Sequence, residues 1–334
     1  MRRLVICFTL LAILAAAPAA SGASWAKPYI REAVNSGLMG PSVEDFRPNA
    51  ALTRRDLGLI VVGITHRERS ISNPDRAVTM TELNRALVNA IGLNPAATAV
   101  RAELTRAGLK PPARAGWETV ARLLRLRYNH PSSRDNLELR PADKATRAEA
   151  AYSVAQLLDM SEWDLQRASD LAGEFHLPAY SDWQRRVLTR AVRFVGYPYV
   201  WGGMSEYRQT LFGVTSRGGF DCSGFVWRVY KLQAWPGAPR LGTTIRGRTT
   251  YAMAGEMRRT ARIGPAKLKA ADIIFYGSNG RTSTPSQITH TGISMGGGWF
   301  IHSSGQGTTI APLDGWYSDT FAWGRRALRE AGLT

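Results

Sequence analysis

One thiol and two imidazoles in this 334-residue chain have the chemistry needed to attack a carbonyl carbon. The chain contains two cysteines, Cys7 and Cys222. Cys7 lies in an N-terminal segment that we expect to be removed, which leaves Cys222 without a disulfide partner in its own chain. A single cysteine of this kind is a buried small hydrophobe, a link to another chain, or a nucleophile. Its surroundings have to distinguish these roles.

The residues around Cys222 favour a nucleophile. Asp221 is a good N-cap, and apolar residues follow with helical spacing, at Phe225, Val226, Val229 and Tyr230. The thiol is therefore predicted in the first turn of a helix, where the macrodipole and unpaired amides lower the pKa of a thiol from about 8.5. The same amides form a site for an oxyanion, so Asp221 and Ser223 are candidate oxyanion or substrate-binding residues.

The two imidazoles belong to predicted neighbouring strands. His290 lies in the segment 288–295 and His302 lies in 299–303, and Gly296-Gly297-Gly298 forms a tight turn between them. The other three histidines have no comparable context.

The register of this hairpin decides whether the two rings meet. If Met295 faces Trp299, then Gly292 lies opposite His302, and His290 lies diagonal to His302 on the same face of the sheet. A slip of one residue would put the rings on opposite faces. With both rings on one face, one imidazole can take the proton of the thiol while the other holds its tautomer.

A zinc site is the competing use of Cys222, His290 and His302. A structural zinc site would need a fourth ligand and usually closer spacing along the chain. A catalytic site would need only these three ligands, but the cysteine would then be bound to the metal. We therefore expect no metal and no organic cofactor.

Five short blocks resemble the NlpC/p60 cell-wall cysteine peptidases in type and order. They are Pro-Tyr-Val-Trp-Gly-Gly at 198–203, Phe-Asp-Cys-Ser-Gly at 220–224, Asp-Ile-Ile-Phe at 272–275, His-Thr-Gly-Ile at 290–293 and Ile-His at 301–302. The resemblance covers about residues 183–325. It implies a papain-like α+β fold, with helices packed on an antiparallel sheet, and needs no cofactor.

The resemblance also implies roles for individual residues. Cys222 would be the nucleophile, His290 the base, His302 the residue that orients the base, and Tyr199 a hydroxyl on the oxyanion side of the site. The family's substrate is the stem peptide of peptidoglycan, commonly cut between γ-D-glutamate and a diamino acid. One departure is the segment 204–219, which is longer than usual and carries Tyr207, Arg208 and Arg217. Another is Ala271, which replaces a glycine.

The first half of the chain contains a repeated signature of helix starts. Residues 46–48 (Phe-Arg-Pro) and 53–56 (Thr-Arg-Arg-Asp) recur as 139–141 (Leu-Arg-Pro) and 146–149 (Thr-Arg-Ala-Glu), and 79–82 (Thr-Met-Thr-Glu) is a weaker third copy. Each copy is predicted as a capping box, with a threonine N-cap and an acidic residue three positions later. Apolar residues follow each box with helical spacing, so we expect an all-helical domain.

This half resembles the S-layer homology family over residues 25–160, although 92–116 departs from the repeat pattern. Trp25, Phe46, Pro48 and the Thr-Arg pair at 53–54 fit the first repeat of that family. The family binds anionic wall polysaccharide, so the resemblance implies a wall-binding role. A purely structural helical domain is the alternative.

The leader and the charge distribution set the expected location. Residues 1–23 combine two arginines, an uncharged apolar stretch and a small-residue cleavage pattern, which predicts a signal peptide, with an uncleaved anchor as the alternative. We expect a helical domain at 24–165, a linker at 166–182, a peptidase domain at 183–334, and no membrane span after signal cleavage.

The chain carries 43 basic and 26 acidic residues, and residues 166–334 hold 21 basic and 10 acidic ones. For an exported protein this charge indicates anionic wall polymer rather than nucleic acid. The sequence therefore predicts a secreted or wall-associated cysteine endopeptidase. A wall-binding protein without catalysis, or a thiol amidase or transacylase on the same fold, remains the alternative.

Overall fold

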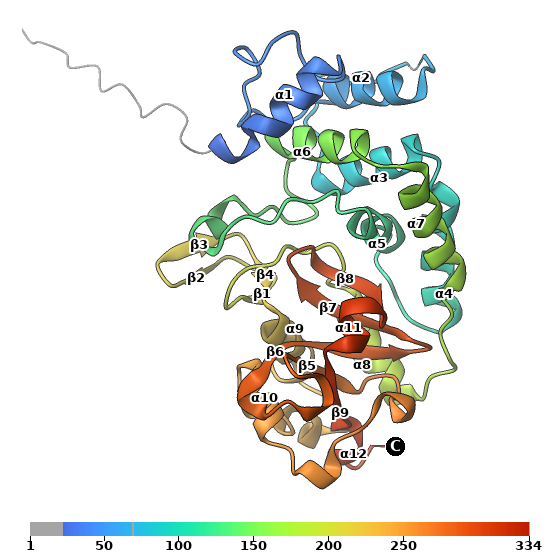
Figure 1. Ribbon diagram of the computed structural model, residues 1–334, viewed down its shortest axis with the longest axis vertical. Coiled ribbons are helices and arrows are strands. Elements are labelled where there is room, and N and C mark those ends of the chain that lie inside the picture. Colours follow the sequence, from blue (N-terminus) through green and yellow to red (C-terminus); the bar gives the residue numbers. More distant parts are fainter. Residues whose placement is uncertain (1–22, 69, 334) are drawn as a thin grey trace, which may run out of the picture.

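The computed structural model describes residues 23–68 and 70–333. The predicted signal peptide lies outside these residues, apart from Ala23. A helical part occupies one end of the molecule, and a part built of helices around a sheet occupies the other (Figure 1). This architecture confirms the α+β class with a preceding helical region. Within the described residues, no helix is long and apolar enough to cross a membrane.

The helical part is made of short helices joined by turns. They are η1 (Ser24–Ala26), α1 (Lys27–Asn35), α2 (Arg54–Thr65), α3 (Met80–Ala90), α4 (Asn94–Arg106), α5 (Ala115–Leu123), η2 (Ser132–Leu137), α6 (Arg147–Leu158) and α7 (Glu162–Glu174). The helix α4 falls in the region that departs from the repeat pattern. The helix α7 occupies most of the expected linker, 166–182, and packs against α4.

Three of the helix starts meet in a closed ring of backbone hydrogen bonds. The N–H of Leu52 donates to the carbonyl of Ala145 over 2.8 Å, Ala145 donates to Val78 over 2.9 Å, and Val78 donates to Leu52 over 2.9 Å. Each of these residues directly precedes the N-cap threonine of α2, α3 or α6. The repeat seen in the sequence is therefore a three-part arrangement around one centre.

The predicted capping boxes are present in two of the three copies. Thr53 and Thr79 each accept a hydrogen bond from the backbone three residues on, and the acidic side chain there accepts one in return. Thr146 also caps its helix, but Glu149 does not return the bond, so the capping box predicted at 146–149 was wrong. The carboxylate of Glu149 instead lies 3.0 Å from Nε2 of His130, inside the helical part.

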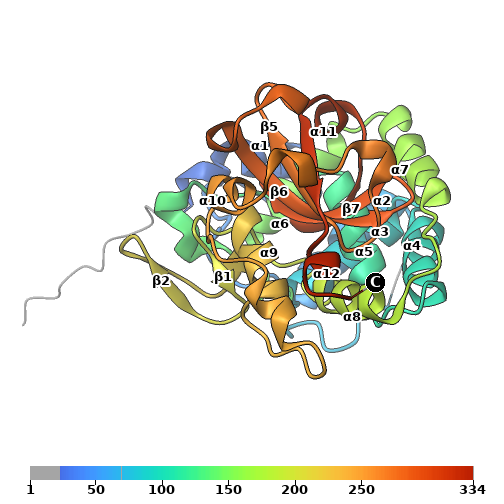
Figure 2. The same ribbon diagram turned by 90° about the horizontal axis from the view of Figure 1, so that it is seen from below.

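The second part is built around a five-stranded antiparallel sheet of order β8-β7-β6-β5-β9. The strands are β5 (Ile273–Gly277), β6 (Ile288–Gly296), β7 (Trp299–Ser304), β8 (Gly307–Pro312) and β9 (Phe321–Arg325). The α-helices of this part are α8 (Asp182–Val192), α9 (Cys222–Tyr230), α10 (Thr250–Gly255), α11 (Gly315–Asp319) and α12 (Ala327–Glu330). Figure 2 shows the sheet from below, with α9 and α8 beside it.

Smaller elements complete this part of the molecule. Two short hairpin-like pairs, β1 with β4 and β2 with β3, precede the helix α9. Their bounds, with those of the 3-10 turns, are β1 (Met204–Ser205), β2 (Gln209–Leu211), β3 (Val214–Ser216), β4 (Gly219–Phe220), η3 (Pro239–Thr243), η4 (Arg259–Ala261), η5 (Pro265–Lys267), η6 (Gly280–Thr282) and η7 (Pro285–Gln287).

The register between β6 and β7 agrees with the sequence analysis at the two histidines. Gly292 pairs with His302, as expected. The expected pair of Met295 with Trp299 was wrong, because a bulge after Ser294 brings Gly296 opposite Trp299. The bulge adds one residue next to the turn and leaves the pairing at the histidines unchanged.

The helical part and the sheet part share one interface, in which arginines of the helical part donate to backbone carbonyls. Arg114 donates to the carbonyls of Val195 and Arg193 over 2.9 and 2.7 Å. Arg122 donates to the carbonyl of Gly196 over 2.6 Å and also to that of Gln306. Several of the many arginines therefore hold the two parts together.

Candidate active site

Cys222 is the first residue of α9, as the sequence predicts. The carboxylate of Asp221 caps the helix by accepting a hydrogen bond from the N–H of Gly224. The side chain of Cys222 is almost buried, with 9% of the residue exposed. Its sulfur receives hydrogen bonds from the backbone N–H groups of Ser223 and Thr291. Because Thr291 follows His290 on β6, the thiol lies against the strand that carries the first imidazole.

Two glycines allow the start of α9 to approach the preceding loop closely. The N–H of Asp221 donates to the carbonyl of Gly203 over 3.0 Å. A Cβ on Gly224 would overlap that same carbonyl oxygen. Gly203 and Gly224 therefore allow the two backbone segments to touch. This contact brings the 198–203 loop against the start of α9, where Cys222 lies.

The two imidazoles form a direct pair. Nε2 of His290 lies 2.8 Å from Nδ1 of His302, and the two rings are nearly perpendicular. His302 is 1% exposed on β7, whereas His290 is partly exposed on β6. The diagonal relation predicted from the register therefore brings the rings into hydrogen-bonding contact.

Burial sets the protonation of all three groups. It raises the pKa of the Cys222 thiol to about 12, with a further increase from the carboxylate of Asp221. Burial also lowers the pKa of His290 to about 4 and holds the pKa of His302 well below its usual range. The sequence analysis expected a lowered thiol pKa at the helix start, and that expectation was wrong because desolvation outweighs the two backbone hydrogen bonds.

Aromatic side chains surround the imidazole pair. The rings of Tyr276 and Tyr317 lie 5.6 and 6.1 Å from that of His290, and Phe300 lies 4.5 Å from His302. The ring of Trp316, on α11, lies 6.3 Å from His290 and is exposed at the surface. These rings exclude water from the back of the pair and leave an indole at its outer edge.

Tyr199 lies on the other side of the thiol. It forms an isolated bridge with Phe220, the residue two before Cys222. The pKa of its hydroxyl is raised by burial and by the nearby Cys222 and Asp221, so the hydroxyl keeps its proton. It can therefore serve as a hydrogen-bond donor near the sulfur.

Arg248 belongs to the site and was not identified from the sequence. Its Nη1 donates to Oγ of Ser223 over 2.7 Å and to the carboxylate of Asp221 over 3.2 Å. Its Nη2 donates to the carbonyl of Gly202 over 2.7 Å and to that of Gly203 over 3.2 Å. One guanidinium thus ties the helix cap to the loop. No motif surrounds Arg248 in the sequence, so only the fold reveals this contact.

These contacts define what the other two candidate residues do in the structure. The carboxylate of Asp221 is occupied by the helix cap and by Arg248, and the hydroxyl of Ser223 donates to Asp221 over 3.0 Å. The backbone N–H of Ser223 is directed at the sulfur. Of Asp221 and Ser223, therefore, neither side chain faces the sulfur of Cys222, and the group that does is the backbone N–H of Ser223.

The long 204–219 segment forms the hairpin of β2 and β3 beside the site. Phe212 at its tip and Tyr207 before it are exposed, as are Arg208 and Arg217. Phe212 lies against Gly202, where an added Cβ would contact its ring. The segment therefore adds an aromatic and basic edge to the loop that precedes the nucleophile.

The helical part reaches the same loop through η2. The carboxylate of Asp135 accepts a hydrogen bond from the N–H of Trp201 over 2.9 Å. Burial raises the pKa of Asp135 to about 6. The helical part therefore contacts the Trp-Gly-Gly loop two residues after Tyr199.

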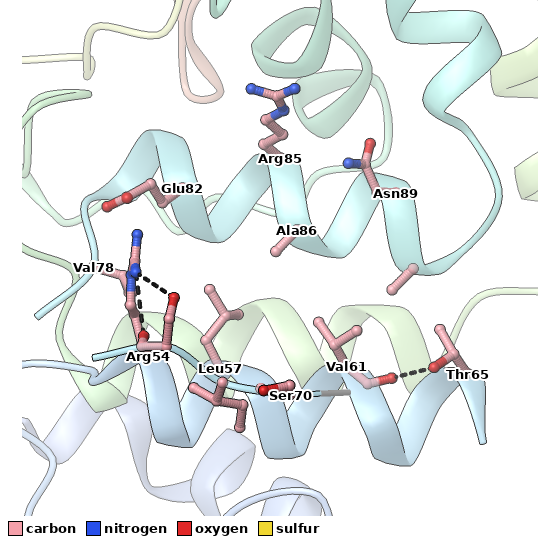
Figure 3. Close-up of a pocket in the computed structure, with 14 residues that line it drawn as sticks. Arg54, Leu57, Val61, Thr65, Ser70, Val78, Glu82, Arg85, Ala86 and Asn89 are labelled. Atoms are coloured by element: carbon pink, nitrogen blue, oxygen red, sulfur yellow. Dashed lines mark hydrogen bonds between the residues drawn. The ribbon is translucent and has the colours of Figure 1, made fainter. Parts of the chain in front are cut away.

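A cleft lies in the helical part, away from Cys222. It has a volume of about 520 Å³ and lies between α2 and α3 (Figure 3). Arg54, Arg85, Glu82 and Asn89 contribute polar groups to its lining. Arg54 also donates to the backbone and hydroxyl of Ser72 over 3.2 Å, which ties the segment before α3 to the cleft.

Metal ligation was considered for the thiol and the two imidazoles. Among the residues that the structure describes, no group of three or more histidine, cysteine or acidic side chains is arranged to hold a metal ion.

Comparison with known proteins identifies both parts of the chain. Residues 196–327 match the NlpC/P60 family, and residues 19–57 match the S-layer homology domain. The C-terminal part is an NlpC/P60 domain. The S-layer homology match covers the first of the predicted repeats and does not extend over the whole helical part.

Several of the similar curated proteins are named as peptidases. The chain is 30% identical over 121 residues to a gamma-D-glutamyl-L-lysine dipeptidyl-peptidase of Bacillus subtilis (strain 168), covering 36% of this chain and 32% of that protein. It is 30% identical over 132 residues to the probable peptidoglycan endopeptidase LytE of the same organism, covering 40% and 30%. It is 29% identical over 143 residues to the murein DD-endopeptidase MepH of Escherichia coli (strain K12), covering 43% and 44%.

These matches are partial. The matched segments span between 21% and 44% of the lengths of the six curated relatives.

Proposed function

We propose that this protein is an exported cysteine endopeptidase that hydrolyses amide bonds in the stem peptides of peptidoglycan. The observation that carries the proposal is the imidazole pair, 2.8 Å apart, beside a thiol at a helix start. The NlpC/P60 match and the names of the relatives support the same reaction class and substrate.

The imidazole pair determines which nitrogen receives the proton. Nε2 of His290 is engaged with Nδ1 of His302, so Nδ1 of His290 is the nitrogen left for the thiol. For that nitrogen to accept a proton, Nε2 of His290 must carry the hydrogen and donate it to His302. His302 therefore acts as the group that orients the base and holds its tautomer.

The attack begins from a neutral thiol and a neutral base. With a thiol pKa of about 12 and an imidazole pKa of about 4, both groups are uncharged at neutral pH. His290 takes the proton as the sulfur of Cys222 bonds to the amide carbon, so the charge develops on the carbonyl oxygen rather than on a free thiolate. The backbone N–H of Ser223 and the hydroxyl of Tyr199 are the donors for that oxyanion.

The second half of the reaction returns the proton. His290 protonates the leaving amine, the amide C–N bond breaks, and a thioester to Cys222 remains. Water, deprotonated by the same imidazole, then attacks the thioester, releases the acid and restores the thiol. No cofactor takes part in this sequence.

We further propose that the bond cut joins γ-D-glutamate to a diamino acid. The name of the dipeptidyl-peptidase relative supports this bond, whereas the name of the murein DD-endopeptidase indicates another. Arg208 and Arg217 are exposed on the 204–219 segment, whose hairpin packs against η2, and their positive charge would attract an anionic substrate such as one with a free glutamate carboxylate.

The helical part is proposed to hold the enzyme on the cell wall through anionic polysaccharide. The S-layer homology match supports this role, as does Arg54 in the lining of the α2–α3 cleft (Figure 3). No nucleic-acid partner is proposed.

Incubation of the purified chain with wall fragments, followed by mass spectrometry of the products, tests the enzymatic proposal. We expect cleavage within stem peptides by the unaltered chain and none by Cys222→Ala. The masses of the products identify the bond.

Other outcomes favour the alternatives. Products released by Cys222→Ala would contradict the thiol mechanism. Intact stem peptides separated from sugar would identify an amidase, and products joined to an added amine would identify a transacylase. A folded chain that binds walls and cuts nothing would be a binding protein.

A further inference from the structure

A second cleft lies between the ends of α5 and α6 and the start of α7. It has a volume of about 360 Å³. Its polar and aromatic lining comes from Arg125, Gln156, Asp159, Trp163, Asp164 and Arg167. Neither the catalytic groups nor the α2–α3 cleft uses any of these side chains.

The indole of Trp163 is the most unusual feature of this cleft. It is 71% exposed, more than the exposed Trp201 and Trp316 beside the active site. In a soluble protein, a large aromatic side chain left at the surface of a cleft usually marks a binding site. The flat face of an indole suits the apolar face of a pyranose ring as well as it suits other flat ligands.

The charges of the cleft identify the class of ligand. Two arginines, Arg125 and Arg167, are matched by two aspartates, Asp159 and Asp164. Asp164 caps α7 and Arg167 pairs with Asp314, so the groups directed to a ligand are those of Arg125, Asp159 and Gln156. These offer donors and acceptors to hydroxyl and acetamido groups without selecting an anion. The second cleft therefore suits a neutral sugar better than an anionic polymer.

An ion pair joins the cleft to the catalytic site. Nη2 of Arg167 lies 3.1 Å from the carboxylate of Asp314. Asp314 is the N-cap residue of α11, the helix whose Trp316 lies 6.3 Å from the ring of His290. The helices α7 and α11 lie near each other in both views of the molecule (Figure 1 and Figure 2). A ligand that occupies the cleft would thus continue past α11 toward the imidazole pair.

We propose that this cleft binds the glycan strand of the substrate, with an N-acetylated hexosamine stacked on Trp163. The stem peptide attached to that strand would then extend over α11 to Cys222. This inference rests on the proposed function for its substrate, and it adds a sugar subsite formed by the helical part. A subsite of this kind gives a function to the contact between α7 and α11 of the NlpC/P60 domain.

Two measurements test the sugar subsite. In the first, the full chain with Cys222→Ala is titrated with the tetramer of N-acetylglucosamine by calorimetry, with and without W163A. We expect W163A to weaken binding at least fivefold, and W163F to recover part of the loss because a ring remains. L158A, on the neighbouring exposed surface of α6, is the matched control and should leave binding unchanged.

The second measurement compares two substrates of the active chain. One is a free stem peptide, and the other is the same peptide still linked to its disaccharide. We expect W163A to raise KM at least fivefold for the linked substrate, with kcat unchanged, and to leave both constants unchanged for the free peptide.

The outcomes separate this inference from the proposed function. If neither substrate is cut, the proposed function fails, and the calorimetric result alone decides the subsite. Absence of tetramer binding, or equal binding by W163A, overturns the subsite. An equal loss on both substrates also overturns it, because Trp163 would then act through the fold.

Discussion

At the scale of single residues, burial determines the protonation state of the Cys222 thiol more than the dipole of the helix α9 does. A helix N-terminus favours a negative charge by about 0.3–1 kcal/mol. Raising the pKa of the Cys222 thiol to about 12 corresponds to about 4 kcal/mol against the thiolate. The reactive pair is therefore a thiol with a neutral imidazole, which makes the position of His290 Nδ1 the controlling feature.

The thiol pKa has a direct consequence for alkylation. Because the thiol of Cys222 ionises only as the pH approaches 12, its rate of reaction with iodoacetamide should rise about tenfold per pH unit between pH 7 and 9. Peptide mapping by mass spectrometry would follow Cys222 separately from Cys7. A rate that reaches a plateau below pH 8 would show a low-pKa thiolate and contradict this assignment.

At the scale of elements, the repeated helix starts build a common centre for three helices. The ring of hydrogen bonds through Leu52, Val78 and Ala145 places the starts of α2, α3 and α6 around one point. From this ring α2 and α3 run side by side, and the cleft lies between them (Figure 3). Arg54 directly follows the N-cap Thr53, so the repeat itself positions this arginine of the cleft.

The α2–α3 cleft should account for binding to the wall. The double substitution Arg54→Ala with Arg85→Ala should reduce cosedimentation of the Cys222→Ala chain with wall fragments at least threefold, since it removes Arg54 from the cleft and Arg85 from the other side of α3, beside Trp117. The matched control is Lys27→Ala with Arg31→Ala, which removes two exposed cations from α1. An equal loss in both variants would indicate an effect of net charge alone.

At the scale of the whole molecule, the two parts form one packed unit rather than two separate domains. Buried apolar residues of both parts belong to a single continuous cluster. Arg122 is buried at the interface, where it pairs with Glu118 over 3.3 Å and donates to the carbonyl of Gly196. Through Asp135 and Trp201, the helical part also touches the catalytic loop.

Loss of the buried guanidinium should destabilise both parts together. We expect Arg122→Met to lower the free energy of unfolding by about 3–5 kcal/mol, because it leaves Glu118 buried without its ion pair. Urea unfolding followed by circular dichroism measures this change. The exposed Arg101→Met should change stability by less than about 0.5 kcal/mol.

The unfolding curves also test the shared core. A single transition is expected for the unaltered chain, since one apolar cluster connects both parts. Two separate transitions would show that the helical part and the NlpC/P60 domain unfold independently.

The local features of the site could be predicted from the sequence because each depends on residues close together in the chain. Helical spacing and an N-cap located the start of α9 at Cys222. Strand alternation placed His290 and His302 on one face, and Gly292 was correctly paired with His302. The bulge after Ser294 escaped prediction because an extra residue beside a turn leaves no periodic signal.

Contacts between distant segments were decided only by the tertiary structure. Arg248 joins Asp221 to the loop at Gly202, and the sequence analysis had no motif by which to find it. Glu149 left its capping box for His130 because that ring is buried beside it, and a local pattern cannot anticipate such a competitor. Spacing along the chain determined which groups are present, whereas desolvation and packing between segments determined their charge and their partners.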